Sequence, residues 1–187
     1  TVNMLGCHDG IPLLDLKGLL QEEEIQSLID RIVSRGGMVK NLHGQKNLYY
    51  QVNATYYSAL GESDEKMLLA RAIQMFMPGK PQVWYLDLFA GKNDHEAVRR
   101  AGESGHKEIN RTNLSTDQIT EGLKKDVVQK QLALIRMRNT HKAFSEGAEV
   151  AISGGERSLE IRWEYNSAFA TLYVNFESGT YTIVESR

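Results

Sequence analysis

The sequence predicts an α/β fold followed by a small antiparallel β-sheet domain, and three observations lead to this prediction. The apolar run Met4–Ile11 contains a His-Asp pair and breaks at Gly10, as a buried parallel strand does at the mouth of an α/β barrel. An apolar run from Gln82 to Leu88 is interpreted as a second buried strand between two helical segments, the alternation typical of a parallel barrel. After Phe144, apolar and charged residues alternate as in antiparallel strands.

Three longer helices are predicted from apolar residues that recur at helical spacing. The first has Glu22 to Glu24 in its first turn, where negative charge suits the positive end of a helix, and it ends at Gly36-Gly37. The second runs from about Asp64 to Phe76 behind the capping residue Ser63. The third covers Val127 to about His141. A capping box at residues 115–118 predicts one more, short helix before the third.

Two polar stretches are candidates for chemistry, and each has a simpler explanation. His8 and Asp9 at the end of a strand can face a substrate, but a capping histidine and a solvated aspartate would give the same residues. The run from Tyr49 to Tyr57 combines phenol and amide groups, which suit sugar recognition, yet a half-buried structural segment is equally tyrosine-rich. For Tyr56 and Tyr57 we favour the structural interpretation.

Composition narrows the class of protein. The 187 residues are 41% hydrophobic and 25% charged, an ordinary globular mix, and the formal net charge is −2. No basic patch recurs, which argues against nucleic acid, and no apolar run approaches the roughly 20 residues that cross a bilayer. Cys7 is the only cysteine, which favours a reducing, cytoplasmic compartment. No histidine has metal-ligand spacing, so we expect no metal site. We also expect no organic cofactor.

Five stretches, in this order, carry a family resemblance: Met4–Ile11, Leu48–Leu60, Pro78–Tyr85, Ala90–Asp94 and Ile109-Asn110-Arg111. Together they resemble the sucrose phosphorylase group of the α-amylase-type glycoside hydrolases, family thirteen. The resemblance implies that residues 1–143 form the C-terminal part of a catalytic (β/α)8 TIM barrel, namely its last two strand-helix units with an inserted subdomain at about 12–60. Residues 144–187 would then be the small C-terminal antiparallel β domain of the family.

The resemblance also assigns roles to particular residues. Enzymes of this group are retaining, with a nucleophile, a general acid/base and a third carboxylate that stabilises the transition state. The third carboxylate belongs to a His-Asp pair on the seventh barrel strand, which matches His8 and Asp9, and the family's Ile-Asn-Arg arginine, a ligand of the sugar, matches Arg111. Its Tyr-Gln pair, on a loop that rearranges between the half-reactions, matches Tyr50 and Gln51. The tyrosine helps to admit phosphate and the glutamine contacts the sugar.

One position beside the Ile-Asn-Arg motif departs from the family, and two catalytic residues of the family lie outside the sequence. Lys107 stands two residues before Ile109, where the group usually carries an arginine. The nucleophile and the acid/base of the family lie on the fourth and fifth barrel strands, upstream of Thr1. We therefore expect these 187 residues to need the missing N-terminal part of the barrel, or another copy of the chain, as a partner.

Three functions follow from these observations. The first is reversible cleavage of sucrose or a related α-glucoside by inorganic phosphate, the co-substrate, to give α-glucose 1-phosphate. The second is hydrolysis or transglycosylation of an α-glucoside, in which water or another acceptor takes the place of phosphate. The third is a non-catalytic carbohydrate-binding role. Neither nucleic acid nor a membrane is expected as a partner.

Overall fold

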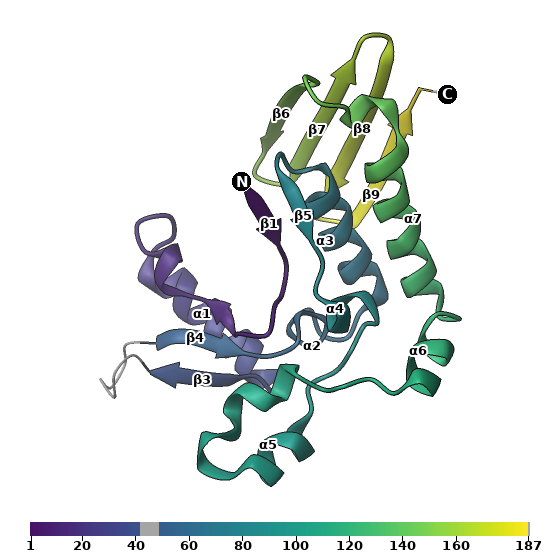
Figure 1. Cartoon of the computed structure of the whole chain (residues 1–187). Coiled ribbons are helices and arrows are strands. Elements are labelled where there is room, and N and C mark those ends of the chain that lie inside the picture. The colour runs from purple at the N-terminus through teal and green to yellow at the C-terminus, as the bar shows by residue number, and fades with distance from the viewer. Residues whose placement is uncertain (42–48, 187) are drawn as a thin grey trace. The chain divides into compact units, whose positions relative to one another are not determined.

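The computed structural model describes residues 1–41 and 49–186 (Figure 1). These residues divide into two compact units. The first unit contains Thr1–Leu5, Asp64–Gln82 and Leu123–Arg187, and the second contains Gly6–Ser63 and Val83–Gly122. The chain therefore passes from the first unit to the second after Leu5 and again after Gln82. The predicted domain bounds at 143/144 and at about 12–60 stay predictions, and part of the latter range, residues 42–48, lies outside the described residues.

The first unit contains two short parallel strands and two long helices. Strand β1 (Val2–Met4) pairs with β5 (Lys80–Gln82) in parallel, from Val2 opposite Lys80 to Met4 opposite Gln82. Helix α3 (Asp64–Phe76) has the predicted bounds, and α7 (Asp126–Thr140) lies within one residue of the prediction. Along the chain the order is β1, α3, β5, α7, which is the strand-helix alternation expected from the sequence.

A buried polar network ties these helices to the strands. The Gln74 amide on α3 donates to the backbone oxygens of Asn3, 3.1 Å away, and of Gln82, 2.9 Å away. On the same helix the fully buried Arg71 contacts Gln74 and donates from Nε to Gln131 of α7 at 2.8 Å. Because a buried polar group without a partner is destabilising, this network fixes how α3 and α7 pack on the two strands.

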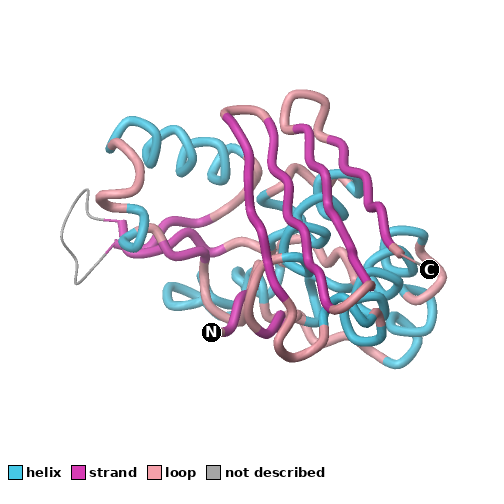
Figure 2. Tube along the Cα trace, turned by 90° about the horizontal axis from the view of Figure 1, so that it is seen from above, coloured by secondary structure: helices cyan, strands magenta, loops and turns pink. Residues whose placement is uncertain are grey.

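The C-terminal sheet of the first unit is an antiparallel meander, as predicted (Figure 2). Its strands are β6 (Glu149–Gly155), β7 (Ser158–Tyr165), β8 (Ala168–Asn175) and β9 (Thr180–Glu185). Alternate residues point to opposite faces, so Ile161, Trp163, Leu172 and Val174 are buried on one side. Asn166, in the turn between β7 and β8, has a φ of 54°, a conformation that asparagine tolerates better than most residues.

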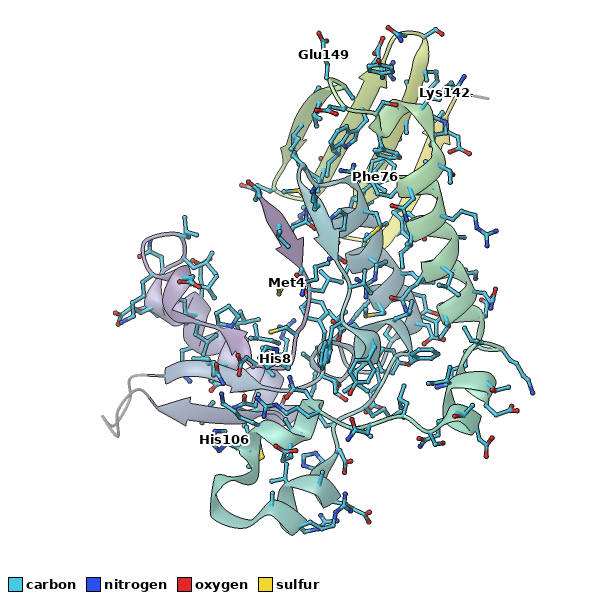
Figure 3. All side chains as sticks on the ribbon, in the orientation of Figure 1. Met4, His8, Phe76, His106, Lys142 and Glu149 are labelled. Carbon is cyan, nitrogen blue, oxygen red and sulfur yellow. The ribbon has the colours of Figure 1, made fainter. Side chains whose placement is uncertain are left out.

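Aromatic side chains join α3 to this sheet. The Phe76 ring, labelled in Figure 3, lies 5.3 Å from the ring of Phe144 in η4 (Lys142–Phe144), and Phe144 lies 5.5 Å from Trp163. The indole nitrogen of Trp163 donates to the backbone oxygen of Phe76 at 2.7 Å, and both residues are buried. This bond satisfies a carbonyl at the C-terminus of α3, where the helix itself supplies no partner.

The second unit has its own small core. Helix α1 (Glu22–Ser34) forms where predicted and packs over the antiparallel sheet β2 (Ile11–Pro12), β4 (Tyr49–Asn53) and β3 (Met38–Asn41). The core consists of apolar side chains from the helix and the sheet region: Leu13, Ile29, Ile32, Val52 and Ala54. Short elements complete the unit: η1 (Leu14–Leu16), α2 (Tyr56–Ala59), α4 (Tyr85–Leu88), α5 (His95–Ala101), η3 (Gly102–Asn110) and α6 (Thr116–Gly122).

Two predicted elements are wrong. The first strand is not a buried one on Met4–Ile11, because β1 ends at Met4, and Val2 and Met4 are exposed. The run Gln82–Leu88 is not a strand, because β5 ends at Gln82 and the chain turns into helix α4 after the extended residue Trp84. Leu86 is buried and points inward from this single helical turn. A short apolar run has no periodicity that separates a buried strand from a buried turn of helix, so the sequence pattern was ambiguous there.

Other predictions are confirmed in detail. Ser115 and Gln118 form the predicted capping box, with backbone-to-side-chain bonds of 2.8 and 3.2 Å ahead of α6. Tyr57 is buried in α2, as its structural interpretation requires.

None of the helices within residues 1–41 and 49–186 combines the length and apolar character needed to span a bilayer.

The bond from Trp163 to α3 provides a test of the packing in the first unit. We expect Trp163→Phe to lower the free energy of unfolding by about 1–3 kcal/mol, because the buried carbonyl of Phe76 loses its donor while the aromatic ring is kept. Chemical denaturation measures the change. The control is Tyr173→Phe on the exposed part of β8, which should stay within about 0.5 kcal/mol of the wild type. Equal effects of the two substitutions would contradict the role of the bond.

Candidate active site

The segment that carries His8 and Asp9 is irregular, and side chains hold it in place. The backbone nitrogen of Gly6 donates to the Asp87 carboxylate at 2.9 Å, and a Cβ atom on residue 6 would lie only 2.6 Å from that carboxylate. Glycine is therefore needed at position 6 for this close approach. The Asp9 backbone nitrogen contacts the Cys7 sulfur at 3.3 Å, a weak bond that closes the turn around His8.

The Ile-Asn-Arg motif supplies partners for three consecutive carbonyl groups of this segment. Nδ2 of Asn110 donates to the oxygens of Cys7 at 2.8 Å and of Asp9 at 2.9 Å. Nε of Arg111 donates to the oxygen of His8 at 2.9 Å. Backbone carbonyls outside a strand or helix need other hydrogen-bond donors, and here two adjacent side chains provide them. The motif thereby fixes the backbone that presents Asp9.

The Asp9 carboxylate lies among three nitrogen-bearing side chains. Lys107 Nζ is 2.9 Å from Oδ1, Arg111 Nη2 is 3.6 Å from the same oxygen, and His8 Nε2 is 3.4 Å from Oδ2. The hydrogen bond from Lys107 is the largest cause that lowers the pKa of Asp9 below its ordinary value of 3.8, with smaller contributions from the charges of Lys107, His8 and Arg111. Asp9 is therefore an ionised carboxylate at neutral pH.

Arg111 is shared between the backbone and two carboxylates. Its Nη1 lies 3.7 Å from Glu108 and its Nη2 lies 3.6 Å from Asp9, while its side chain is 32% exposed. Both distances are ion-pair distances and exceed normal hydrogen bonds. The guanidinium fork is thus oriented through Nε and retains donor capacity at its outer nitrogens.

An aromatic group lies beside the His-Asp pair. The His8 ring, labelled in Figure 3, is 6.1 Å from the Trp84 ring, and Trp84 is 4.5 Å from Tyr85. Tyr85 donates its hydroxyl to the backbone oxygen of Thr112 at 2.6 Å, and burial raises the pKa of this phenol. The His8 side chain is 63% exposed and that of Asp9 40%, so the imidazole ring borders an accessible carboxylate and has the Trp84 ring beside it.

Gln51 reaches the segment through another side chain rather than directly. Its amide donates to Asn53 Oδ1 at 2.9 Å, and a Cβ on Gly10 would lie 2.7 Å from the same oxygen. Both amides are buried on strand β4, which packs against η3, the element of Lys107 and Asn110. The Tyr50 side chain lies outside what the structure describes, so only its place on β4 is established.

The Ala90–Asp94 stretch has a structural task in this unit. Asn93 accepts from the backbone nitrogen of Thr55 at 2.7 Å and donates its own backbone nitrogen to Ser58 at 3.0 Å. Asp94 caps α5 by accepting from Ala97, and this bond is the largest cause that lowers the pKa of Asp94. These contacts position the loops around the site and do not face Asp9.

The structure thus brings together three of the five predicted site residues, His8, Asp9 and Arg111. It adds Lys107 and Asn110, which sequence reasoning did not place in the site. In the sequence, Lys107 is marked only by its difference from the family's arginine, and Asn110 only by its place in the Ile-Asn-Arg motif. Within residues 1–41 and 49–186, no three His, Cys, Asp or Glu side chains gather as metal ligands would.

Comparison with known proteins identifies the class to which this geometry corresponds. No family model matches the sequence. A sucrose phosphorylase from Agrobacterium vitis is 38% identical over 202 aligned residues, which cover 100% of this chain and 40% of that protein. The chain is therefore similar, over its whole length, to part of a glycoside phosphorylase, and the resemblance inferred from its motifs is confirmed.

A more particular similarity is to sucrose 6(F)-phosphate phosphorylases. One from Ilumatobacter coccineus is 54% identical over 98% of this chain and 36% of its own length. The crystal structure of one from Thermoanaerobacter thermosaccharolyticum superposes with a TM-score of 0.92 at 39% identity, covering 100% of this chain and 39% of that one. The chain thus spans little more than a third of the length of these proteins.

The contact between Lys107 and Asp9 leads to a prediction about pH. We expect Lys107→Met to raise the pKa of Asp9 toward 3.8, because the largest stabilising contact of the ionised form is removed. The stability that this contact adds is present above pH 3.8, and it is lost as the pH falls through the lowered pKa of the folded state. Titration of the Asp9 carboxyl carbon by NMR measures the shift.

Lys92→Met is the matched control for this titration. Lys92 forms a comparable ion pair with Glu62 at 2.6 Å, so its loss removes one positive charge of the same kind without touching Asp9. The Asp9 titration should be unchanged in this variant. A pKa for Asp9 that does not move in Lys107→Met would show that the contact is absent in solution.

Proposed function

We propose that the protein to which these 187 residues belong is a retaining glycoside phosphorylase that cleaves an α-glucoside with inorganic phosphate and releases α-glucose 1-phosphate. The observation that carries the proposal is the ionised Asp9 held by Arg111 and Lys107, in a chain similar over its whole length to phosphorylases. A fixed negative charge next to a guanidinium fork suits a glucosyl unit, whose transition state is positively charged and whose hydroxyls need paired donors and acceptors.

The roles within the site follow from its geometry. Asp9 would stabilise the oxocarbenium-like transition state and accept from sugar hydroxyls, while Arg111 would donate to the same sugar through its outer nitrogens. His8 and the neighbouring Trp84 ring would border the sugar, since aromatic faces pack on C–H surfaces. Tyr50 would help to admit phosphate and Gln51 would contact the sugar, as the family resemblance implies; Gln51 is linked to the segment of Asp9 through Asn53, which lies next to Gly10.

We also propose that β1 and β5, with the helices that follow them, form part of a (β/α)8 barrel. Parallel β1 and β5, each followed along the chain by a long helix, have the order of the last two strand-helix units of a (β/α)8 barrel. Two parallel strands alone would leave both edges and much apolar surface uncovered. We therefore propose that the remaining strands come from another part of the parent protein or from another copy of the chain, and that the nucleophile and the general acid/base come from that other part of the parent protein. The lone cysteine supports a reducing, cytoplasmic location.

The donor we favour is sucrose or a sucrose carrying a phosphate group on its fructosyl unit. The names of the relatives support both, since proteins called sucrose phosphorylase and sucrose 6(F)-phosphate phosphorylase both match the chain. Phosphate is the proposed co-substrate, and no organic cofactor or metal is required by this chemistry. Hydrolysis or transglycosylation would use the same residues and differ only in the acceptor.

The experiment that tests the function compares both donors with and without phosphate in the parent protein. We expect glucose 1-phosphate to form only when phosphate is present, from sucrose, from its phosphorylated form or from both. The 187-residue chain alone serves as a control and should be inactive, because Asp9 by itself cannot form a glucosyl intermediate. Release of free glucose without any glucose 1-phosphate would reject phosphorolysis, and turnover by the short chain alone would reject the proposed assembly.

Within that assay, Asp9→Asn tests the central role. We expect kcat to fall by at least ~100-fold, because one preorganised charge that faces the transition state is removed. Glu177→Gln is the matched control: it also removes a carboxylate with a 2.9 Å ion pair, here to Arg157, but in the C-terminal sheet region. The control should retain normal turnover. Near-normal turnover of Asp9→Asn would mean that Asp9 is only a surface carboxylate.

A further inference from the structure

Asn110 makes contacts that the proposed chemistry does not itself use. Its side chain is 2% exposed, and its Nδ2 donates to the backbone oxygens of Cys7 at 2.8 Å and of Asp9 at 2.9 Å. An amide nitrogen carries two hydrogens, so both are committed to the two residues that flank His8. One side chain therefore holds the backbone on both sides of the His-Asp pair.

The orientation of this amide is determined by those two bonds. Oδ1 of Asn110 is buried and has no hydrogen-bond partner among the described residues. A flipped amide would set that oxygen against two carbonyl oxygens, which is repulsive. Since a buried acceptor without a partner is itself unfavourable, the two donated bonds must be what makes an asparagine suitable here. Neither leucine nor aspartate of nearly the same shape could donate them.

The consequence for Asp9 is geometric. Asn110 holds the Asp9 carbonyl directly, and Arg111 holds the preceding carbonyl of His8 at 2.9 Å. With the backbone fixed in this way, the Asp9 carboxylate lies 2.9 Å from Lys107 Nζ. The charged or titratable groups that face it are Lys107, Arg111 and His8. Without these backbone hydrogen bonds from Asn110 and Arg111, an exposed ion pair of this kind would not by itself fix the position of the carboxylate.

We propose that Asn110 is a positioning residue of the site: by clamping the carbonyls of Cys7 and Asp9, it sets the place of the Asp9 carboxylate. Its effect on turnover rests on the proposed function, whereas its effect on Asp9 does not. A misplacement of about 1 Å in a catalytic group can lower a rate by ~100-fold, so the loss of the clamp should reduce kcat far more than it weakens substrate binding.

The test uses Asn110→Leu in the parent protein. This substitution keeps the size of the side chain and removes both donors. We expect kcat per folded protein to fall at least ~10-fold with KM changed less than ~3-fold, and the folded fraction is measured separately so that a general loss of stability is not counted as a loss of kcat. We also expect the carboxyl resonance of Asp9, assigned by its disappearance in Asp9→Asn, to titrate at higher pH than in the wild type. If Asn110→Leu does not fold, Asn110→Ser keeps one donor and should give the same changes to a smaller extent.

The matched control is Ile29→Val, which removes a methyl group from the separate core under α1. It should lower the thermal midpoint while leaving kcat and the Asp9 titration unchanged. An Asp9 titration unchanged in a folded Asn110 variant, or one shifted equally by Ile29→Val, would overturn the positioning role. If the wild-type parent protein shows no phosphate-dependent cleavage, the proposed function fails, and the Asp9 titration alone decides whether Asn110 positions the carboxylate.

Discussion

The contact between the Cys7–Asp9 segment and the Asn110-Arg111 pair is the interaction on which the candidate site depends. The two partners are 101 residues apart in the chain at their Asn110–Asp9 bond, and the first has no regular secondary structure. Such a segment gains no order from strand or helix bonds, so side-chain donors must fix it. The Asp87 carboxylate does so at Gly6, and the Asn-Arg pair does so at the next three carbonyls.

The electrostatics of the site point to one kind of role for Asp9. A general acid in a glycosidase needs a pKa raised toward neutrality, as burial among apolar side chains provides. Asp9 has the opposite environment: it is 40% exposed, and Lys107 and Arg111 lower its pKa. It is therefore suited to be a constant negative charge and hydrogen-bond acceptor, and unsuited to deliver a proton. This agrees with the proposed role of transition-state stabiliser, which needs no change of protonation during the reaction.

Much of the fold could be predicted from sequence because its signals are local. Helices α1, α3 and α7 have apolar periodicity over many residues, and the C-terminal strands alternate between two faces. The run Gln82–Leu88 was mistaken for a strand because seven residues are too few for periodicity to separate a strand from a turn of helix. The tasks of Lys107 and Asn110 could not be predicted, since both depend on a backbone segment about one hundred residues earlier that only the folded chain brings near.

The Ile-Asn-Arg motif shows how neighbouring residues divide the work of a site. Successive side chains at the end of η3 differ in burial: Ile109 and Asn110 are buried, while Arg111 is 32% exposed. The asparagine donates both of its amide hydrogens to backbone carbonyls and has none left for a ligand. The arginine donates only Nε to the backbone. Its outer nitrogens lie 3.6 and 3.7 Å from two carboxylates, so they can move closer to these groups or donate to the proposed sugar. Because rigidity comes from the buried residue, the exposed one can be a donor to substrate without having to hold the loop alone.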